Sequence, residues 1–66
     1  MPKVRDAIRL LEDQGWIRDR TRGSHRQYRH PDRAGLVTIA GRPRDDIARG
    51  TWGSILRQAG LKGDDT

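Results

Sequence analysis

The fold of this chain is decided by residues 16–30, WIRDRTRGSHRQYRH, which form two short extended runs on either side of Gly23-Ser24. Glycine at the first position of a two-residue loop is typical of a type II′ β-hairpin turn. We therefore predict two antiparallel strands, over residues 16–22 and 25–30. A turn of this length also fixes which residues of the two strands face each other.

The predicted register sorts the hairpin side chains onto two faces, because successive strand residues point to opposite sides. One face carries the pairs Arg22–His25, Arg20–Gln27 and Arg18–Arg29. The other carries Ile17, Asp19 and Thr21 against His30, Tyr28 and Arg26. We expect Ile17 and Tyr28 to face the core. Asp19 is unexpected on that side, and Arg26 is the partner we would assign to it.

Two amphipathic helices flank the predicted sheet. The first covers about residues 3–14, where apolar side chains recur at helical spacing at Val4, Ala7, Ile8 and Leu11. Gly15 should end this helix in the left-handed conformation and let Trp16 fold back onto Leu11. The second should begin at Thr51 as N-cap and bury Trp52, Ile55, Leu56 and Ala59 before Gly60-Leu61 repeats the ending.

Between the hairpin and the second helix we expect one more strand and two loops. Residues 30–35 read as a loop with a proline, and residues 36–40 as a β-branched strand with Val37 and Ile39 inward. Residues 41–50 are polar and read as a flexible loop. The predicted order is α-β-β-β-α in one domain over residues 1–61, with a flexible tail at 62–66. Two helices need only one sheet face, so the face with His25 should stay open.

The composition points to a polyanionic partner. Charged residues make up 35% of the 66, the net charge is +5, and only Lys3 and Lys62 among the 14 basic residues are lysines. Six arginines and both histidines lie between Arg18 and Arg33. Arginine binds phosphate through two parallel hydrogen bonds, so phosphate binding would explain this bias. A GC-rich genome, which favours arginine codons, would explain it equally well.

Several classes of site are excluded or disfavoured. The chain has no cysteine, so disulfides, thiolate nucleophiles and cysteine zinc sites are impossible. His25 and His30 should point to opposite faces and cannot share a metal ion. No Walker or dinucleotide glycine loop is present, so we expect no small-molecule cofactor. No apolar run reaches membrane-spanning length and no signal-peptide core is visible, so we expect a cytoplasmic protein without a membrane partner.

His25 is the residue that could carry chemistry. Imidazole both takes and gives a proton near neutral pH, and RNA supplies its own nucleophile in the 2′-OH, so one positioned base beside arginines could suffice for cleavage. His25 could equally be an ordinary exposed histidine of a solvated hairpin. A non-catalytic RNA-binding module and a small subunit that meets an acidic protein partner also stay open. We expect His30, Trp16 and Trp52 to be structural.

Several segments together resemble one known family. They are Gly15-Trp16, Arg20 to Tyr28, His30-Pro31, Gly35 to Ile39, Gly50-Thr51 and Ser54 to Leu61. In order and spacing this chain is similar to the HicA toxins of bacterial and archaeal toxin–antitoxin pairs. The Gly-Ser-His turn and the Ser-Ile-Leu-Arg-Gln-Ala-Gly-Leu ending are the most specific parts.

The resemblance implies an α+β fold like that of double-stranded-RNA-binding domains, with a three-stranded antiparallel sheet and two helices on one face. It implies a metal-independent endoribonuclease that cleaves mRNA without the ribosome, and a HicB-like antitoxin that covers the active site. The catalytic histidine of the family maps onto His25. We expect the RNA-binding residues to be Arg18, Arg20, Arg22, Gly23, Ser24, Gln27 and Arg29. Many members have a second histidine in the loop after the third strand, where this chain has Arg42, and Asp19 stands where members are often apolar.

Overall fold

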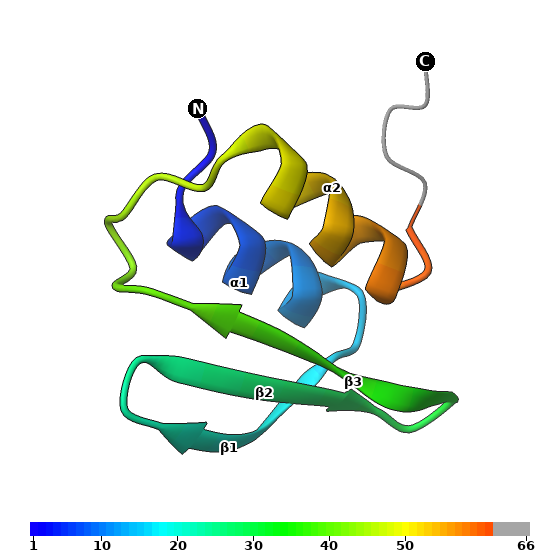
Figure 1. Ribbon diagram of the computed structural model, residues 1–66. Coiled ribbons are helices and arrows are strands. Elements are labelled where there is room, and N and C mark those ends of the chain that lie inside the picture. The colour runs from blue at the N-terminus through cyan, green and yellow to red at the C-terminus, as the bar shows by residue number, and fades with distance from the viewer. Residues whose placement is uncertain (62–66) are drawn as a thin grey trace.

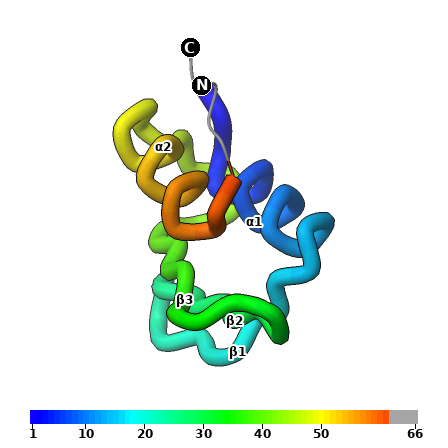
Figure 2. The backbone as a smooth tube through the Cα atoms, turned by 90° about the vertical axis from the view of Figure 1, so that its right-hand side faces the viewer, coloured from blue at the N-terminus to red at the C-terminus, as the bar shows by residue number. Residues whose placement is uncertain are grey.

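The computed structural model describes residues 1–61 and has the predicted order α-β-β-β-α. The elements are α1 (Val4–Asp13), β1 (Ile17–Arg22), β2 (His25–His30), β3 (Arg33–Ala40) and α2 (Arg49–Gln58). The strands form one antiparallel sheet in the order β1-β2-β3. Both helices lie on the same side of this sheet, which makes two layers (Figures 1 and 2). The predicted fold class is therefore confirmed, whereas the tail expected at 62–66 lies outside the described residues.

Both helices end as the sequence predicts. Gly15 follows α1 with a φ of 93°, and the backbone N–H of Trp16 donates to the carbonyl of Leu11 at 2.9 Å. Gly60 follows α2 with a φ of 73°, and Leu61 makes the corresponding bond at 2.8 Å. These bonds provide N–H donors for carbonyl groups that have no hydrogen-bond partner within the last helical turn. Glycine is needed at both positions because other residues rarely adopt this conformation.

The core lies between the helices and the inner face of the sheet. Its buried side chains are Val4, Ala7, Leu11, Trp16, Tyr28, Val37, Ile39, Ile47, Ile55 and Ala59, with Ile8, Trp52 and Leu61 packed against them. Most of these were expected from the apolar spacing. Ile47 was not, because a single isoleucine in a polar segment gives no periodic signal.

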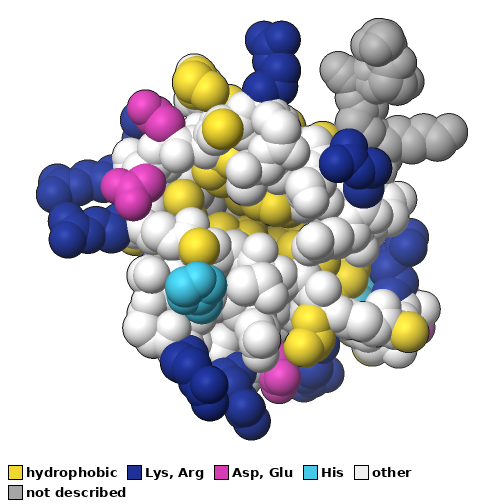
Figure 3. Space-filling view, in the orientation of Figure 1, with side chains coloured by type: hydrophobic (Ala, Val, Ile, Leu, Met, Phe, Trp, Pro, Cys, Tyr) yellow, Lys and Arg dark blue, Asp and Glu magenta, His cyan; other side chains and the backbone are white. Residues whose placement is uncertain are grey.

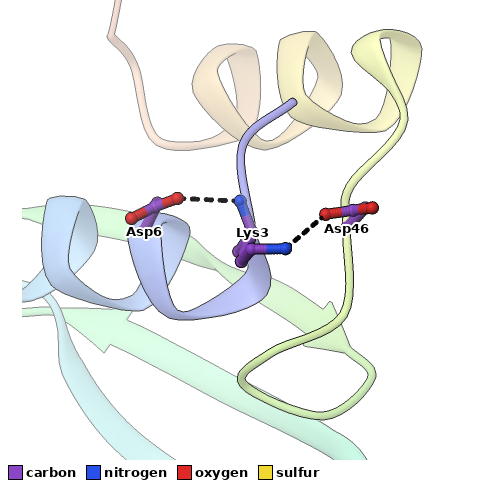
Figure 4. A network of polar contacts seen from close by, with 3 residues as sticks. All are labelled: Lys3, Asp6 and Asp46. Carbon is purple, nitrogen blue, oxygen red and sulfur yellow. Dashed lines mark hydrogen bonds and ion pairs between the residues drawn. The ribbon is translucent and has the colours of Figure 1, made fainter.

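The segment 41–48 is a pinned connection and not the flexible loop that its polarity suggests. The N–H groups of Val4 and Arg5, in the first turn of α1, donate to the carbonyls of Asp45 and Pro43, both at 2.9 Å. Lys3 adds a 2.7 Å ion pair from its Nζ to Asp46, and its backbone N–H donates to Asp6 at 2.8 Å (Figure 4). Lys3 is the N-cap residue of α1, and the connection supplies the acceptors for the first two helical N–H groups after it.

Two predicted boundaries differ in the structure. Helix α2 begins at Arg49 with Ala48 as N-cap, so Thr51 lies within its first turn and does not cap it. Strand β3 begins at Arg33, three residues before the predicted start. Gly35 has a φ of 86°, and the pairing with β2 is irregular next to it. The glycine allows a bulge that the sequence pattern does not reveal.

The hairpin register is confirmed near the turn and wrong beyond Asp19. Arg22 pairs with His25 and Arg20 with Gln27, as predicted, but a bulge then shifts the pairing. Beyond the bulge Arg18 pairs with Tyr28, and Ile17 pairs with Arg29. Since directly paired residues share a face, Ile17 lies on the open face and Arg18 on the helix side. Ile17 is accordingly exposed and does not join the core.

Candidate nucleic-acid interface

The β1–β2 turn has the geometry that its sequence predicts. Gly23 has a φ of 60°, while Ser24 does not adopt a positive φ, as a type II′ turn requires. The turn is held from one side by the end of β3, because the Gly41 N–H donates to the Ser24 carbonyl at 3.0 Å. The residue that follows the turn, His25, is thus placed at a fixed corner of the sheet, paired with Arg22 and Ala40.

Arg26 reinforces the same corner. Its Nη1 donates to the carbonyl of Gly41 at 2.7 Å, and its side chain is partly buried. The sequence led us to pair Arg26 with Asp19, and that assignment is wrong. Gly41, with a φ of 106°, is the signal that sequence reasoning missed. A glycine directly after a β-branched strand marks a sharp exit of the chain, and its carbonyl then needs a donor.

Four of the predicted site residues line one concavity on the open face, which is the sheet face opposite the helices. Arg20, Arg22, His25 and Gln27 surround a volume of about 250 Å³, which we call the basic concavity. Within residues 1–61 neither Arg20 nor Arg22 forms an ion pair. Their charges are therefore available to an anion, and His25 lies beside them with its side chain exposed.

The other predicted RNA-binding residues lie outside this concavity. Gly23 and Ser24 form the adjacent turn. Arg29 is on the open face at the far end of β2, where its Nε lies 3.5 Å from Oδ1 of Asp19. Arg18 stands on the helix side opposite Tyr28, so the structure separates it from the predicted set.

His30 has the structural role that we expected for it. Its Nε2 lies 3.0 Å from the Gln14 carbonyl, and its Nδ1 accepts the Asp32 N–H at 3.0 Å. Because Nδ1 accepts, Nε2 carries the proton and donates to Gln14. The ring also packs edge-on against Trp16, with centroids 5.2 Å apart. These contacts join the turn after β2 to the end of α1.

The helix side of the sheet carries two arginines close to the buried Tyr28. Burial raises the pKa of the Tyr28 phenol, and Glu12 raises it further, while Arg18 and Arg26 act in the opposite direction. On the connection after β3, the hydrogen bond and charge of Lys3 lower the pKa of Asp46. Neither group lies in the basic concavity.

The charged surface is uneven. Figure 3 shows basic side chains projecting at the left, near the connection after β3, and below, near the β1–β2 hairpin, with a histidine on the surface between them. No three potential metal ligands of the His, Cys, Asp and Glu types are grouped together within residues 1–61. In the same part of the chain, neither helix has the length and apolar character that crossing a membrane requires.

Comparison with known families gave one informative match. A family model described as HicA toxin of bacterial toxin-antitoxin systems matches residues 4–61, which is nearly the whole described chain. A comparison with curated proteins gave no match. The matched span includes both helices, all three strands and the basic concavity.

Proposed function

The chain belongs to the HicA family of toxins from toxin–antitoxin pairs, and on that premise we propose that it is an endoribonuclease that cleaves mRNA at the basic concavity. The observation that carries this proposal is the placement of Arg20, Arg22 and His25 around one exposed concavity. A phosphodiester bound there would meet one imidazole and two guanidinium groups that form no ion pair within residues 1–61. This combination suits acid–base cleavage of RNA.

The proposed reaction uses the nucleophile that RNA carries. His25 accepts the proton of the 2′-OH, the 2′ oxygen bonds to phosphorus, and the bond from phosphorus to the 5′ oxygen breaks. The imidazolium formed then returns a proton to the departing 5′ oxygen. Arg20 and Arg22 stabilise the charge that grows on the phosphoryl oxygens. The products are a 2′,3′-cyclic phosphate and a 5′-hydroxyl.

We propose that Gly23, Ser24 and Gln27 line the path of the RNA beside the catalytic pair of arginines. The turn residues offer backbone groups at the rim, and Gln27 pairs with Arg20 across the concavity. Arg29 shares the open face but is already paired with Asp19, so its contribution is smaller. Arg18, on the helix side, is left out of this set.

The experiment is an incubation of the purified chain with end-labelled RNA in EDTA, beside its His25→Ala variant. We expect the parent to cleave in EDTA, the variant to be inactive, and an RNA with 2′-deoxyribose at the cleaved position to be resistant. Products ending in 5′-phosphate, or activity that EDTA abolishes, would contradict the mechanism. Intact RNA that still binds the parent would favour the alternative of a non-catalytic RNA-binding module.

We further propose a HicB-like antitoxin as the protein partner, bound over the open face with carboxylates toward Arg20 and Arg22. Opposite charges speed association and exclude wrong partners. Titrating the antitoxin against a fluorescent RNA on the His25→Ala variant should displace the RNA. Simultaneous binding of both would show that inhibition acts from a distance. The complex should also melt at a higher temperature than the free toxin, since the antitoxin binds only the folded state.

A further inference from the structure

The end of the open face away from the turn differs from the basic concavity. It carries a row of three side chains across the sheet, Ile17 on β1, Arg29 on β2 and Leu36 on β3, which we call the apolar row. Ile17 is the direct partner of Arg29. Leu36 precedes Val37, which pairs with Tyr28 and is fully buried, so Leu36 points to the open side, opposite the part of β2 that holds Arg29 and where the pairing becomes irregular.

The apolar row is exposed in the free protein. Ile17 is 45% and Leu36 49% exposed, and with Met1 they are the large apolar residues left exposed among residues 1–61. Single exposed apolar residues are common on protein surfaces. Two that flank one side chain on an otherwise polar sheet face offer apolar surface that a protein partner could remove from water.

The one charged side chain of the row, Arg29, is paired with a neighbouring carboxylate. The bulge places Asp19 beside Arg29, with 3.5 Å between Oδ1 and Nε. An RNA strand gains little from an arginine that already has a carboxylate partner. The basic concavity, by contrast, has two arginines without an ion pair among the described residues. One face therefore offers a cationic half suited to phosphate and a neutral, apolar half suited to protein.

We propose that the apolar row anchors the antitoxin, which binds apolar side chains there and extends carboxylates over the neighbouring concavity. The inference rests on the proposed pairing with a HicB-like protein. It adds which surface of this chain supplies the affinity for that protein. The partner is protein because the Ile17 and Leu36 side chains offer no hydrogen bonds to a nucleotide, while the buried core of a protein interface is more apolar than the rest of the surface. Since both halves share one face, an antitoxin anchored on the row also covers His25.

The test uses the double variant Ile17→Thr and Leu36→Thr, which removes apolar surface while keeping residues compatible with strands. Its control is Gln58→Ala, a neutral change at an exposed position in the helix layer. The measurements are RNA cleavage by the free proteins and their inhibition by the protein encoded beside this chain's gene. We expect unchanged cleavage, and an inhibitory concentration that rises about tenfold or more for the double variant alone.

Two outcomes would overturn the proposal. One is equal inhibition of the double variant and the parent. The other is a loss of RNA binding with unchanged antitoxin affinity, which would assign the row to RNA. Calorimetric titration of the antitoxin into the parent and into the double variant measures binding directly. It therefore tests the anchor even if the parent does not cleave RNA, and a failure of the nuclease proposal is seen separately. If the double variant does not fold, methyl NMR of the parent replaces it. The Ile17 and Leu36 methyl signals should then shift with antitoxin and not with RNA, and the reverse result would refute the anchor.

Discussion

His25 and His30 stand at the two ends of β2 and point to opposite faces of the sheet. His25 is exposed in the basic concavity beside two arginines. His30 is partly buried, with both ring nitrogens in hydrogen bonds and its ring in an edge contact with Trp16. The same residue type is thus accessible to solvent at one end of the strand and held in structural contacts at the other. Freedom from partners, more than residue type, distinguishes a candidate catalyst from a structural group.

Removing the exposed His25 side chain should affect cleavage more than any other single change. We expect His25→Ala to lower the cleavage rate by about 10²-fold or more, as the loss of a positioned general acid–base group does. It should also relieve the growth arrest caused by expression without antitoxin. The free energy of unfolding should stay the same, because the side chain is exposed and little packing is lost. A folded variant as toxic as the parent would refute the catalytic role of His25.

Removing the structural histidine should give the opposite pattern. We expect His30→Ala to lower the free energy of unfolding by about 1–2 kcal/mol through two lost hydrogen bonds and the contact with Trp16. Denaturant titration measures this loss, with His25→Ala as the matched control. At temperatures where the variant is folded, its cleavage rate should match that of the parent. A stable but inactive His30→Ala would reverse the two assignments.

The turn end of the hairpin could be predicted because its signals are local. Gly23-Ser24 specifies both the turn and the first pairs on either side of it, and the placement of His25 follows. The far end could not be predicted in this way. The bulge at Asp19 shifts the strand pairing by one residue. This shift moves Ile17 to the open face and Arg18 to the helix side.

The connection after β3 was missed for a related reason. Its polarity suggests flexibility, whereas the groups that fix it belong to α1 and β2, far away in sequence. Ile47 has only Ala48 as an apolar neighbour in a charged segment, so no apolar periodicity marks it as a core residue. Arg26 finds its acceptor only because Gly41 follows the end of β3 beside it. Contacts of this kind arise from tertiary packing and leave no local pattern.

Arginines on the two sides of β1 provide a finer test of the corrected register. Binding of single-stranded RNA should weaken with salt, with a slope of log K against log [salt] of about 0.7 per neutralised phosphate. We expect Arg22→Ala to reduce this slope by about one phosphate's share. Arg18→Ala should leave the slope nearly unchanged because Arg18 lies on the helix side. Equal losses in both variants would show that RNA reaches around the edge of β1.

The smallest expected effect concerns Tyr28, the buried residue that lies between the two histidines on β2. Burial raises its pKa above the ordinary 10.0, so the unfolded chain ionises first as the pH rises. The stability that this group contributes is complete below about pH 10 and is lost as the pH rises through the higher folded pKa. Unfolding free energies measured from pH 8 to 11 should therefore fall more steeply for the parent than for Tyr28→Phe. Parallel curves would show that the phenol is not protected from ionisation.

The cap of α1 ties the folding of the two ends of the chain together. The acceptors for the N–H groups of Val4 and Arg5 are carbonyls of the segment that follows β3, so these two groups of the first helical turn are satisfied by residues distant in sequence. Forming a helical nucleus is unfavourable in itself. Here the chain between α1 and the segment after β3 must also close before these two hydrogen bonds form. A nascent chain that ends at Ala40 therefore lacks the Pro43 and Asp45 carbonyls that accept from the start of α1. We expect helix and sheet to form in one cooperative step, only after the segment beyond β3 has left the ribosome.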